Sequence, residues 1–236
     1  MSFCLKKAIA IARILPLWGL GGFLVSCTTD TYESGDGDLS YLKAEFALVN
    51  TDHEGKIGSF TTDDDTTIPL ASPQYFKNAK ADTVYRAVVY YNANERPVGQ
   101  IRSLKSVGVC TPFKESDKLN NKPNEKQFVM KTDPIEWESM WLSKNRSWVN
   151  LSLNLLVGVA DGEDEIGQQS LGIRIDREDE HHLYYTLFHD QNGVPEYYTK
   201  NTFISFRLDD RLQQGDSVTV TVNTHHGEQQ KTIVVH

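Results

Sequence analysis

The chain is poor in cysteine and has no long apolar run. Its three cysteines are Cys4, Cys27 and Cys110, and no two of them have the C-x-x-C spacing of common redox and zinc motifs. The main apolar stretch, Ile14 to Val25, has twelve residues and contains Pro16. As a helix it would reach only ~18 Å, against a hydrocarbon core of ~30 Å. A membrane-spanning helix is therefore not expected there.

The beginning of the chain has the features of an export signal. Lys6 and Lys7 precede the apolar stretch, and a small residue precedes Cys27. Leu24-Val25-Ser26-Cys27 resembles the lipobox of bacterial lipoproteins, in which the cysteine is acylated and becomes the first mature residue. We therefore predict that residues 1–26 are a lipoprotein signal peptide and that acyl chains on Cys27 anchor the protein. Thr28 rather than Asp follows the cysteine, and the resemblance then favours the outer membrane.

The predicted mature chain is acidic and has one free thiol. The signal contains three basic residues and no acidic one, so Lys+Arg falls from 24 to 21 against 32 Asp+Glu, a formal net charge of −11. A negative surface repels nucleic acid, which disfavours a nucleic-acid partner. With Cys27 acylated, Cys110 has no cysteine to pair with. An internal disulfide is therefore excluded, and we expect Cys110 to be largely buried at the end of a strand.

The first half of the mature chain is predicted to be a small barrel. Residues 27–38 have no apolar periodicity and are expected to be a flexible tether. Over residues 39–113, alternating or β-branched segments predict strands, at Leu42–Val49, Lys56–Thr62, Thr83–Tyr91 and Val98–Cys110. The proline-bearing stretch after Ile68 is not assigned a strand. About five short strands in this span favour an OB-like topology.

The second half is predicted to be a β-sandwich. Residues 114–134 are polar and contain two prolines, which indicates a linker. Over residues 135–236, period-two alternation predicts strands, around Val149–Val157, Leu171–Ile175, Ile204–Leu208 and Val218–Val222. Asp161-Gly162, Asn192-Gly193 and His226-Gly227 are pairs that hairpin turns favour. The prediction is an all-β protein, an N-terminal OB-like small barrel followed by an antiparallel Ig-like β-sandwich. Only Ile135–Leu142 is expected to form a turn or two of helix.

Four segments together resemble the NigD-like lipoproteins. They are Asp133-Pro134-Ile135-Glu136, Met140-Trp141-Leu142-Ser143, Trp148 to Leu153 and Leu187-Phe188-His189-Asp190. The resemblance covers most of the mature chain, and it implies an N-terminal OB-like domain, a C-terminal β-sandwich and export in Gram-negative anaerobes. The family name comes from a bacteriocin-associated operon, so the resemblance also implies an immunity role. It brings no catalytic residues to this chain.

Acidic and histidine clusters are the candidates for cation or catalytic sites. Asp63-Asp64-Asp65 and residues 161–165 could offer oxygens to Ca²⁺, but neither has EF-hand spacing and a solvated loop explains both. His181-His182 and His225-His226 are adjacent pairs, so in a strand their rings point to opposite faces and cannot share one ion. We predict no metal site and no cofactor.

Aromatic residues could form a sugar-stacking surface, although the sandwich core is the favoured explanation. These residues are Trp137, Trp141, Trp148, Tyr184, Tyr185, Tyr197 and Tyr198. The chain has no G-x-S-x-G motif, and no catalytic residue is predicted. Asp65-Thr66-Thr67 resembles an O-glycosylation acceptor of exported bacterial proteins, which makes Thr66 the candidate for that modification.

The sequence thus predicts a non-enzymatic, outer-membrane lipoprotein that binds or assists an unidentified envelope protein or glycan. A carbohydrate-binding module and an envelope glycoside hydrolase are the alternatives. The hydrolase would need two carboxylates facing each other across a cleft at about 5–9.5 Å.

Overall fold

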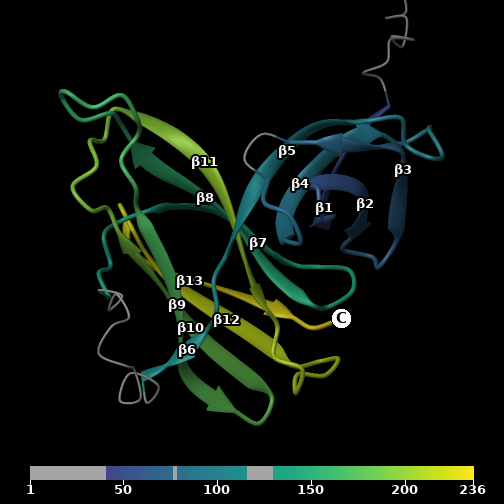
Figure 1. Cartoon of the computed structure of the whole chain (residues 1–236). Coiled ribbons are helices and arrows are strands. Elements are labelled where there is room, and N and C mark those ends of the chain that lie inside the picture. Colours follow the sequence, from purple (N-terminus) through teal and green to yellow (C-terminus); the bar gives the residue numbers. More distant parts are fainter. Residues whose placement is uncertain (1–40, 77–78, 116–129) are drawn as a thin grey trace, which may run out of the picture. The chain divides into compact units, whose positions relative to one another are not determined.

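The computed structural model describes residues 41–76, 79–115 and 130–236 (Figure 1). The predicted signal peptide 1–26, the lipidation site Cys27 and the tether 27–38 lie outside the described residues, as does most of the predicted linker 114–134. Within the described ranges, no helix is long and apolar enough to cross a bilayer.

The first five strands form the predicted OB-type barrel. They are β1 Leu42–Thr51, β2 Lys56–Thr62, β3 Thr67–Tyr75, β4 Val84–Asn92 and β5 Ile101–Val109. β1 pairs antiparallel with β2 and β4, β2 pairs with β3, and β4 pairs with β5. A bridge between Leu70 and Val98 brings β3 to the chain just before β5 and closes the barrel. Phe60, Tyr91 and nine smaller apolar residues fill its interior.

β3 is a strand that the sequence interpretation missed. Pro69 and Pro73 lie within it, and proline cannot donate to a ladder. Both are tolerated because β3 is the last strand of its sheet and because its register with β2 shifts between Ile57 and Ser59. Ile68 and Leu70 still alternate inward and contribute to the barrel core. The two prolines of this segment therefore indicate an edge strand and not a loop.

Eight further strands build the sandwich. They are β6 Phe113–Lys114, β7 Glu136–Leu142, β8 Trp148–Val157, β9 Ser170–Asp179, β10 His182–Asp190, β11 Tyr198–Arg207, β12 Ser217–Thr224 and β13 Gly227–Val234. One sheet has the order β3-β2-β1-β4-β5-β11-β8-β7, and the other has the order β13-β12-β10-β9-β6. Apolar residues of both sheets, such as Leu151 and Phe206 on one and Tyr185 and Val220 on the other, form a shared core. The all-β prediction is confirmed.

The helical turn expected over Ile135–Leu142 is wrong, because this segment is strand β7. Its register with β8 shifts between Trp137 and Ser139, which marks a bulge. The bulge interrupts the alternation and leaves apolar residues at Trp137, Met140 and Trp141. Apolar residues at intervals of three and then one residue match the i, i+3, i+4 spacing of an amphipathic helix.

Among the described strands of the sandwich, four pairings are antiparallel and three are parallel. β10 pairs with β12 in parallel because the chain crosses to β11 in the other sheet between them and returns in the same direction. β5 with β11 and β6 with β9 are the other parallel pairs.

β5 belongs to both halves of the molecule. Its residues from Ile101 to Ser106 pair with β4 of the barrel, and Val107 to Val109 pair with β11 of the sandwich. The two apolar clusters are distinct, but one sheet runs through both. The described residues accordingly belong to one compact unit.

Candidate functional site

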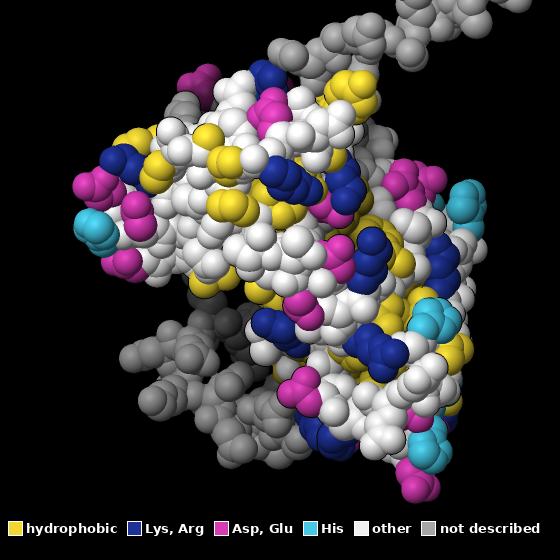
Figure 2. All heavy atoms as spheres, turned by 90° about the vertical axis from the view of Figure 1, so that its right-hand side faces the viewer, with side chains coloured by type: hydrophobic (Ala, Val, Ile, Leu, Met, Phe, Trp, Pro, Cys, Tyr) yellow, Lys and Arg dark blue, Asp and Glu magenta, His cyan; other side chains and the backbone are white. Residues whose placement is uncertain are grey.

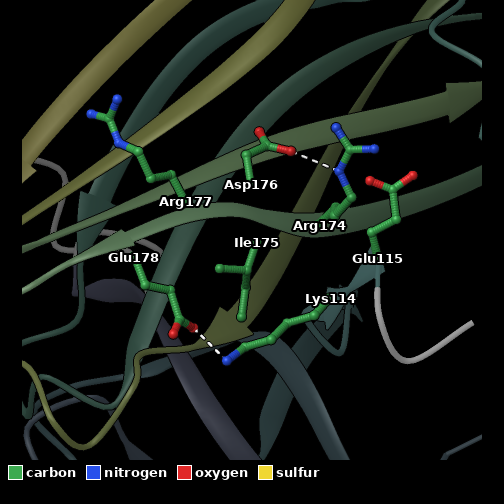
Figure 3. A pocket seen from close by; sticks show the side chains of 7 residues that line it. All are labelled: Lys114, Glu115, Arg174, Ile175, Asp176, Arg177 and Glu178. Atoms are coloured by element: carbon green, nitrogen blue, oxygen red, sulfur yellow. Dashed lines mark hydrogen bonds and ion pairs between the residues drawn. The ribbon is translucent and has the colours of Figure 1, made fainter.

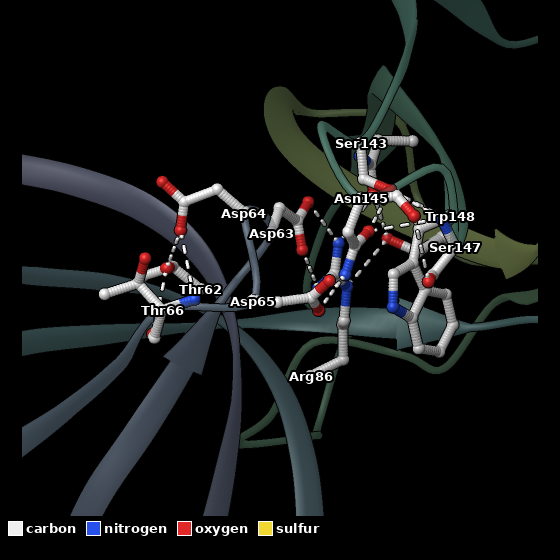
Figure 4. Close-up of polar contacts among 12 residues, drawn as sticks. Thr62, Asp63, Asp64, Asp65, Thr66, Arg86, Ser143, Asn145, Ser147 and Trp148 are labelled. Carbon is white, nitrogen blue, oxygen red and sulfur yellow. Dashed lines mark hydrogen bonds and ion pairs between the residues drawn. The ribbon is translucent and has the colours of Figure 1, made fainter. Parts of the chain in front are cut away.

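A buried arginine joins the barrel to the sandwich (Figure 4). Arg86 on β4 donates two hydrogen bonds to Asp63 in the β2–β3 turn, at 2.5 and 2.7 Å. It also donates to Asn150 Oδ1 on β8 at 3.1 Å and to Ser205 Oγ on β11 at 3.4 Å. The guanidinium lies over the Trp148 ring, 4.6 Å from its centroid. Pairing and hydrogen bonding of this kind offset the cost of burying a charge.

The three acidic residues of the β2–β3 turn have separate partners. Asp63 is bound to Arg86, and Asp65 accepts a hydrogen bond from Asn145 Nδ2 at 2.8 Å. Asp64 accepts from Thr62 Oγ1 at 2.5 Å, and this bond is the main cause that lowers its pKa to about 2. The interpretation of this segment as a solvated loop is thus wrong for Asp63, whose side chain is only 15% exposed. The three carboxylates do not converge as Ca²⁺ ligands would.

A groove lies beside this junction, with a volume of about 290 Å³. We call it the junction groove, and it is lined by Lys43, Ala44, Glu45, Phe46, Asp63, Asp64, Trp141, Leu142, Ser143 and Lys144. Phe46 of β1 contacts Trp141 of β7 edge to face, with ring centroids 5.2 Å apart, and Phe203 of β11 at 5.3 Å. All three rings are partly exposed. The groove therefore combines aromatic surface with charged groups of both signs.

The predicted aromatic set divides between the core and the surface. Trp137, Trp148 and Tyr185 are buried, as the core interpretation required. Trp141 lies in the junction groove, while Tyr197 and Tyr198 are exposed. The seven residues do not form a single surface.

A polar cluster on the outer face of the larger sheet was not predicted. Glu138 on β7 accepts hydrogen bonds from Ser152 Oγ at 2.6 Å and from Asn154 Nδ2 and Asn201 Nδ2 at 2.9 Å each. The bond from Ser152 is the largest cause that lowers the Glu138 pKa. Lys105 on β5 donates to Asn201 Oδ1 at 2.8 Å and lies 4.2 Å from the centroid of the Phe203 ring. Only strand pairing brings these residues together, so their sequence spacing gave no signal.

A larger pocket on the smaller sheet contains paired charges (Figure 3). Its volume is about 460 Å³. Arg174 Nε lies 2.7 Å from Asp176, and Lys114 Nζ lies 2.9 Å from Glu178. The hydrogen bond from Lys114 is the largest cause that lowers the Glu178 pKa. Glu178, held ionised in this way, cannot act as a general acid at neutral pH.

The family-like segment around His189 is structural. His189 is 2% exposed, with Nδ1 3.1 Å from the Asp133 carbonyl oxygen and Nε2 2.8 Å from Gln169 Oε1. Burial lowers the His189 pKa. Asp133 Oδ2 accepts a hydrogen bond from the Gln191 backbone at 2.8 Å. These contacts hold the segment that precedes β7 against the end of β10.

The other predicted candidates lie apart from each other. His181 Nδ1 lies 2.8 Å from Asp216 Oδ1 and His182 Nε2 lies 2.7 Å from Thr219 Oγ1, so the two rings have separate partners. The acidic residues of 161–165 are exposed at a loop tip, as the solvated-loop interpretation required. Thr66 is exposed in the β2–β3 turn. Within the described ranges, no three His, Cys, Asp or Glu side chains are placed to hold a metal ion.

Charged side chains of both signs share one face of the protein. On the face that Figure 2 shows, basic and acidic side chains are interspersed and apolar side chains lie between them.

Two family models match the chain. The NigD-like N-terminal OB domain matches residues 46–107, and the NigD-like C-terminal beta sandwich domain matches residues 117–235. No curated protein matches the chain.

Solved structures share the fold. A NigD-like immunity protein from Bacteroides caccae is 23% identical with a TM-score of 0.57, and the match covers 81% of this chain and 96% of that one. A protein from Parabacteroides distasonis, provisionally named as toxin-related, is 17% identical with a TM-score of 0.56, covering 81% and 92%. A protein from Bacteroides fragilis, provisionally named as a lipoprotein, is 12% identical with a TM-score of 0.54, covering 83% and 97%.

Proposed function

Because the chain belongs to the NigD-like family, we propose that it is a non-enzymatic lipoprotein of the outer membrane whose junction groove binds an envelope partner. The observation that carries this proposal is the groove itself. Aromatic rings from both halves meet there beside charges of both signs, and an interface needs such anchors with a polar rim. Acyl chains on Cys27 would hold the protein at the membrane, so that the groove meets partners of the envelope.

An immunity role is the more specific form of this proposal. One structural neighbour is named an immunity protein and another is provisionally named as toxin-related. In this form the partner is a toxin or the envelope protein that the toxin attacks. Binding alone would then protect the cell, and no catalytic step is needed.

The charge state of the carboxyl groups supports a non-enzymatic role. A glycoside hydrolase needs one carboxyl group with a raised pKa as its general acid. Among the described residues, every carboxyl group with a displaced pKa has a lowered one, and the cause is a hydrogen bond or an ion pair. These groups are Asp52, Asp64, Glu138, Glu178, Asp190, Asp209 and Asp216.

Glycan binding is the second candidate, and the cluster around Glu138 favours it. A carboxylate, two amides and an ammonium group are joined by hydrogen bonds on an exposed sheet face, and the ammonium group lies over the Phe203 ring. Hydroxyl groups of a sugar could hydrogen-bond to this set. Affinity electrophoresis in gels that contain soluble polysaccharide tests it, and Glu138→Gln should remove any retardation if the cluster is the site.

A pull-down from native membranes with the lipidated protein tests the leading proposal. Trp141→Ala removes an aromatic anchor, and Lys144→Glu reverses an exposed charge at the groove. Both variants should lose the captured partner. The matched controls are Tyr75→Ala and Lys80→Glu on the barrel surface, which should retain it. Equal capture by all four variants would contradict binding in the junction groove.

A further inference from the structure

A third cavity opens between the two sheets of the sandwich, at the end where β8 stops and β9 starts. Its volume is about 360 Å³, which lies at the lower end of the range for small-molecule sites. Leu155 and Val157 of β8, Ile204 of β11 and Leu171 of β9 line it. We call it the end cavity.

The end cavity continues the sandwich core. Leu155, Val157 and Ile204 belong to that core, and Leu171 packs against it. Cys110 also lines the cavity, and burial raises the pKa of its thiol to about 11. Much of the wall is therefore apolar.

One lysine side chain lines this largely apolar cavity. Lys200 lines it from β11, directly opposite Leu155 in the strand pairing. Its side chain makes no hydrogen bond or ion pair with any of the residues described here, and it is exposed. Nearby apolar surface is exposed as well: Ile166 is 37% exposed and Tyr198, two residues from Lys200, is 46% exposed. An unpaired cation beside exposed apolar surface is complementary to an anionic head group on an apolar chain.

We propose that the end cavity binds a free fatty carboxylate, with the alkyl chain between the sheets and the carboxylate on Lys200. A neutral apolar ligand would leave Lys200 unused, and a cationic amphiphile would be repelled by it. A sugar would need several hydrogen-bonding side chains, whereas the polar side chains of this cavity other than Lys200 are Gln169, Thr202 and Cys110. This site is distinct from the junction groove and does not depend on the function proposed for it.

Calorimetric titration of soluble residues 28–236, which carry no acyl chain, with dodecanoate tests the proposal. One equivalent should bind. Across hexanoate, octanoate and decanoate, affinity should rise about fourfold for each methylene that becomes buried. Dodecyltrimethylammonium, with the same chain and the opposite charge, should not bind.

Two variants of exposed residues locate the site. Lys200→Gln should weaken dodecanoate binding about fivefold at low salt, as for a partly exposed ion pair. Ile166→Asp places a negative charge at the cavity and should weaken it further. Lys80→Gln on the barrel is the matched charge control and should bind as the parent does.

Any one of the following results would overturn the proposal. The first is equal binding of the anionic and cationic amphiphiles, and the second is an affinity independent of chain length. The third is retention of the protein on vesicles of anionic phospholipid while dodecanoate does not bind, because the occupant would then be a membrane lipid. Unchanged affinity in both Lys200→Gln and Ile166→Asp would place any carboxylate site elsewhere.

Discussion

Arg86 and Asp63 form a two-point ion pair that is almost withdrawn from water: the arginine side chain is 1% exposed and the aspartate side chain 15%. The arginine comes from β4 and the aspartate from the β2–β3 turn, but the guanidinium also contacts Asn150 and Ser205 of the sandwich. The pair therefore orients a charged group of the barrel toward polar residues of the other half. Asn150 Nδ2 is the single buried side-chain nitrogen or oxygen atom without a partner among the described residues.

Replacing Asp63 alone should lower the free energy of unfolding more than replacing both Asp63 and Arg86. Asp63→Ala leaves the buried guanidinium without its counter-charge, and we expect the free energy of unfolding to fall by about 3 kcal/mol. Arg86→Met combined with Asp63→Ala should cost less, because no uncompensated charge remains. Urea unfolding followed by tryptophan fluorescence measures both.

Asp161→Ala is the control for this comparison. Asp161 is an exposed acidic residue at a loop tip, and its replacement should change stability by no more than about 0.5 kcal/mol. If Asp63→Ala were equally mild, the ion pair would not contribute to the stability of the fold.

Because of Cys110, the free energy of unfolding should fall as the pH rises into the alkaline range. The residue is partly buried, and burial raises its pKa to about 11 in the folded protein. The thiol of the unfolded chain ionises at lower pH than the thiol of the folded protein. The contribution of the protonated Cys110 thiol to the free energy of unfolding is therefore fully present below about pH 8.5 and is lost as the pH rises toward 11. Comparing urea midpoints of the parent and Cys110→Ala between pH 8 and pH 11 should reveal a shallower decline in the variant. Parallel declines would mean that the thiol ionises as readily in the folded protein as in the unfolded chain.

Most strands could be predicted from the sequence because their side chains alternate. The predicted strand Lys56–Thr62 matches β2, and Val149–Val157 matches β8 within one residue. β3 and β7 were missed for local reasons, namely prolines in β3 and a bulge in β7. The sequence analysis also assigned no strand to β6, β10 or β13. The predicted turn pairs Asp161-Gly162 and Asn192-Gly193 do lie in turns, whereas Gly227 of the pair His226-Gly227 already begins β13.

The sites could not be predicted in the same way. Phe46, Trp141 and Phe203 meet in space from three distant strands, and only the order β1-β4-β5-β11-β8-β7 brings them near each other. The acidic run Asp63-Asp64-Asp65 was visible in the sequence, but its role depends on an arginine 23 positions from Asp63. Side-chain chemistry could be read from the sequence, whereas partners depend on strand order.

Lipidation of Cys27 is the prediction on which the cellular location depends. Cys27→Ala should give an unprocessed or soluble precursor, because the acylated side chain is lost. Metabolic labelling with a fatty-acid probe, followed by fractionation of the envelope, measures both effects. Cys110→Ala is the matched control and should keep its label. Label retained by Cys27→Ala would show that the lipobox assignment is wrong.

The shared strand β5 leads to a prediction about fragments. A fragment of residues 133–236 contains most of the sandwich core, but it lacks β5 and β6. Without them, β11 loses its partner at Phe203 to Ser205, and β9 loses its partner at Arg174 and Ile175. We expect this fragment to unfold at lower urea concentration and with a broader transition than residues 99–236, which retain both strands.

Circular dichroism and fluorescence should be followed together in this comparison. Coincident transitions for residues 99–236 would indicate one cooperative unit. The full soluble chain, residues 28–236, should be more stable still, since it keeps the contacts of Arg86 with Asn150 and Ser205. If residues 133–236 unfolded as cooperatively and at the same midpoint as residues 99–236, the sandwich would be independent of β5, and the connection between the two halves would add nothing to its stability.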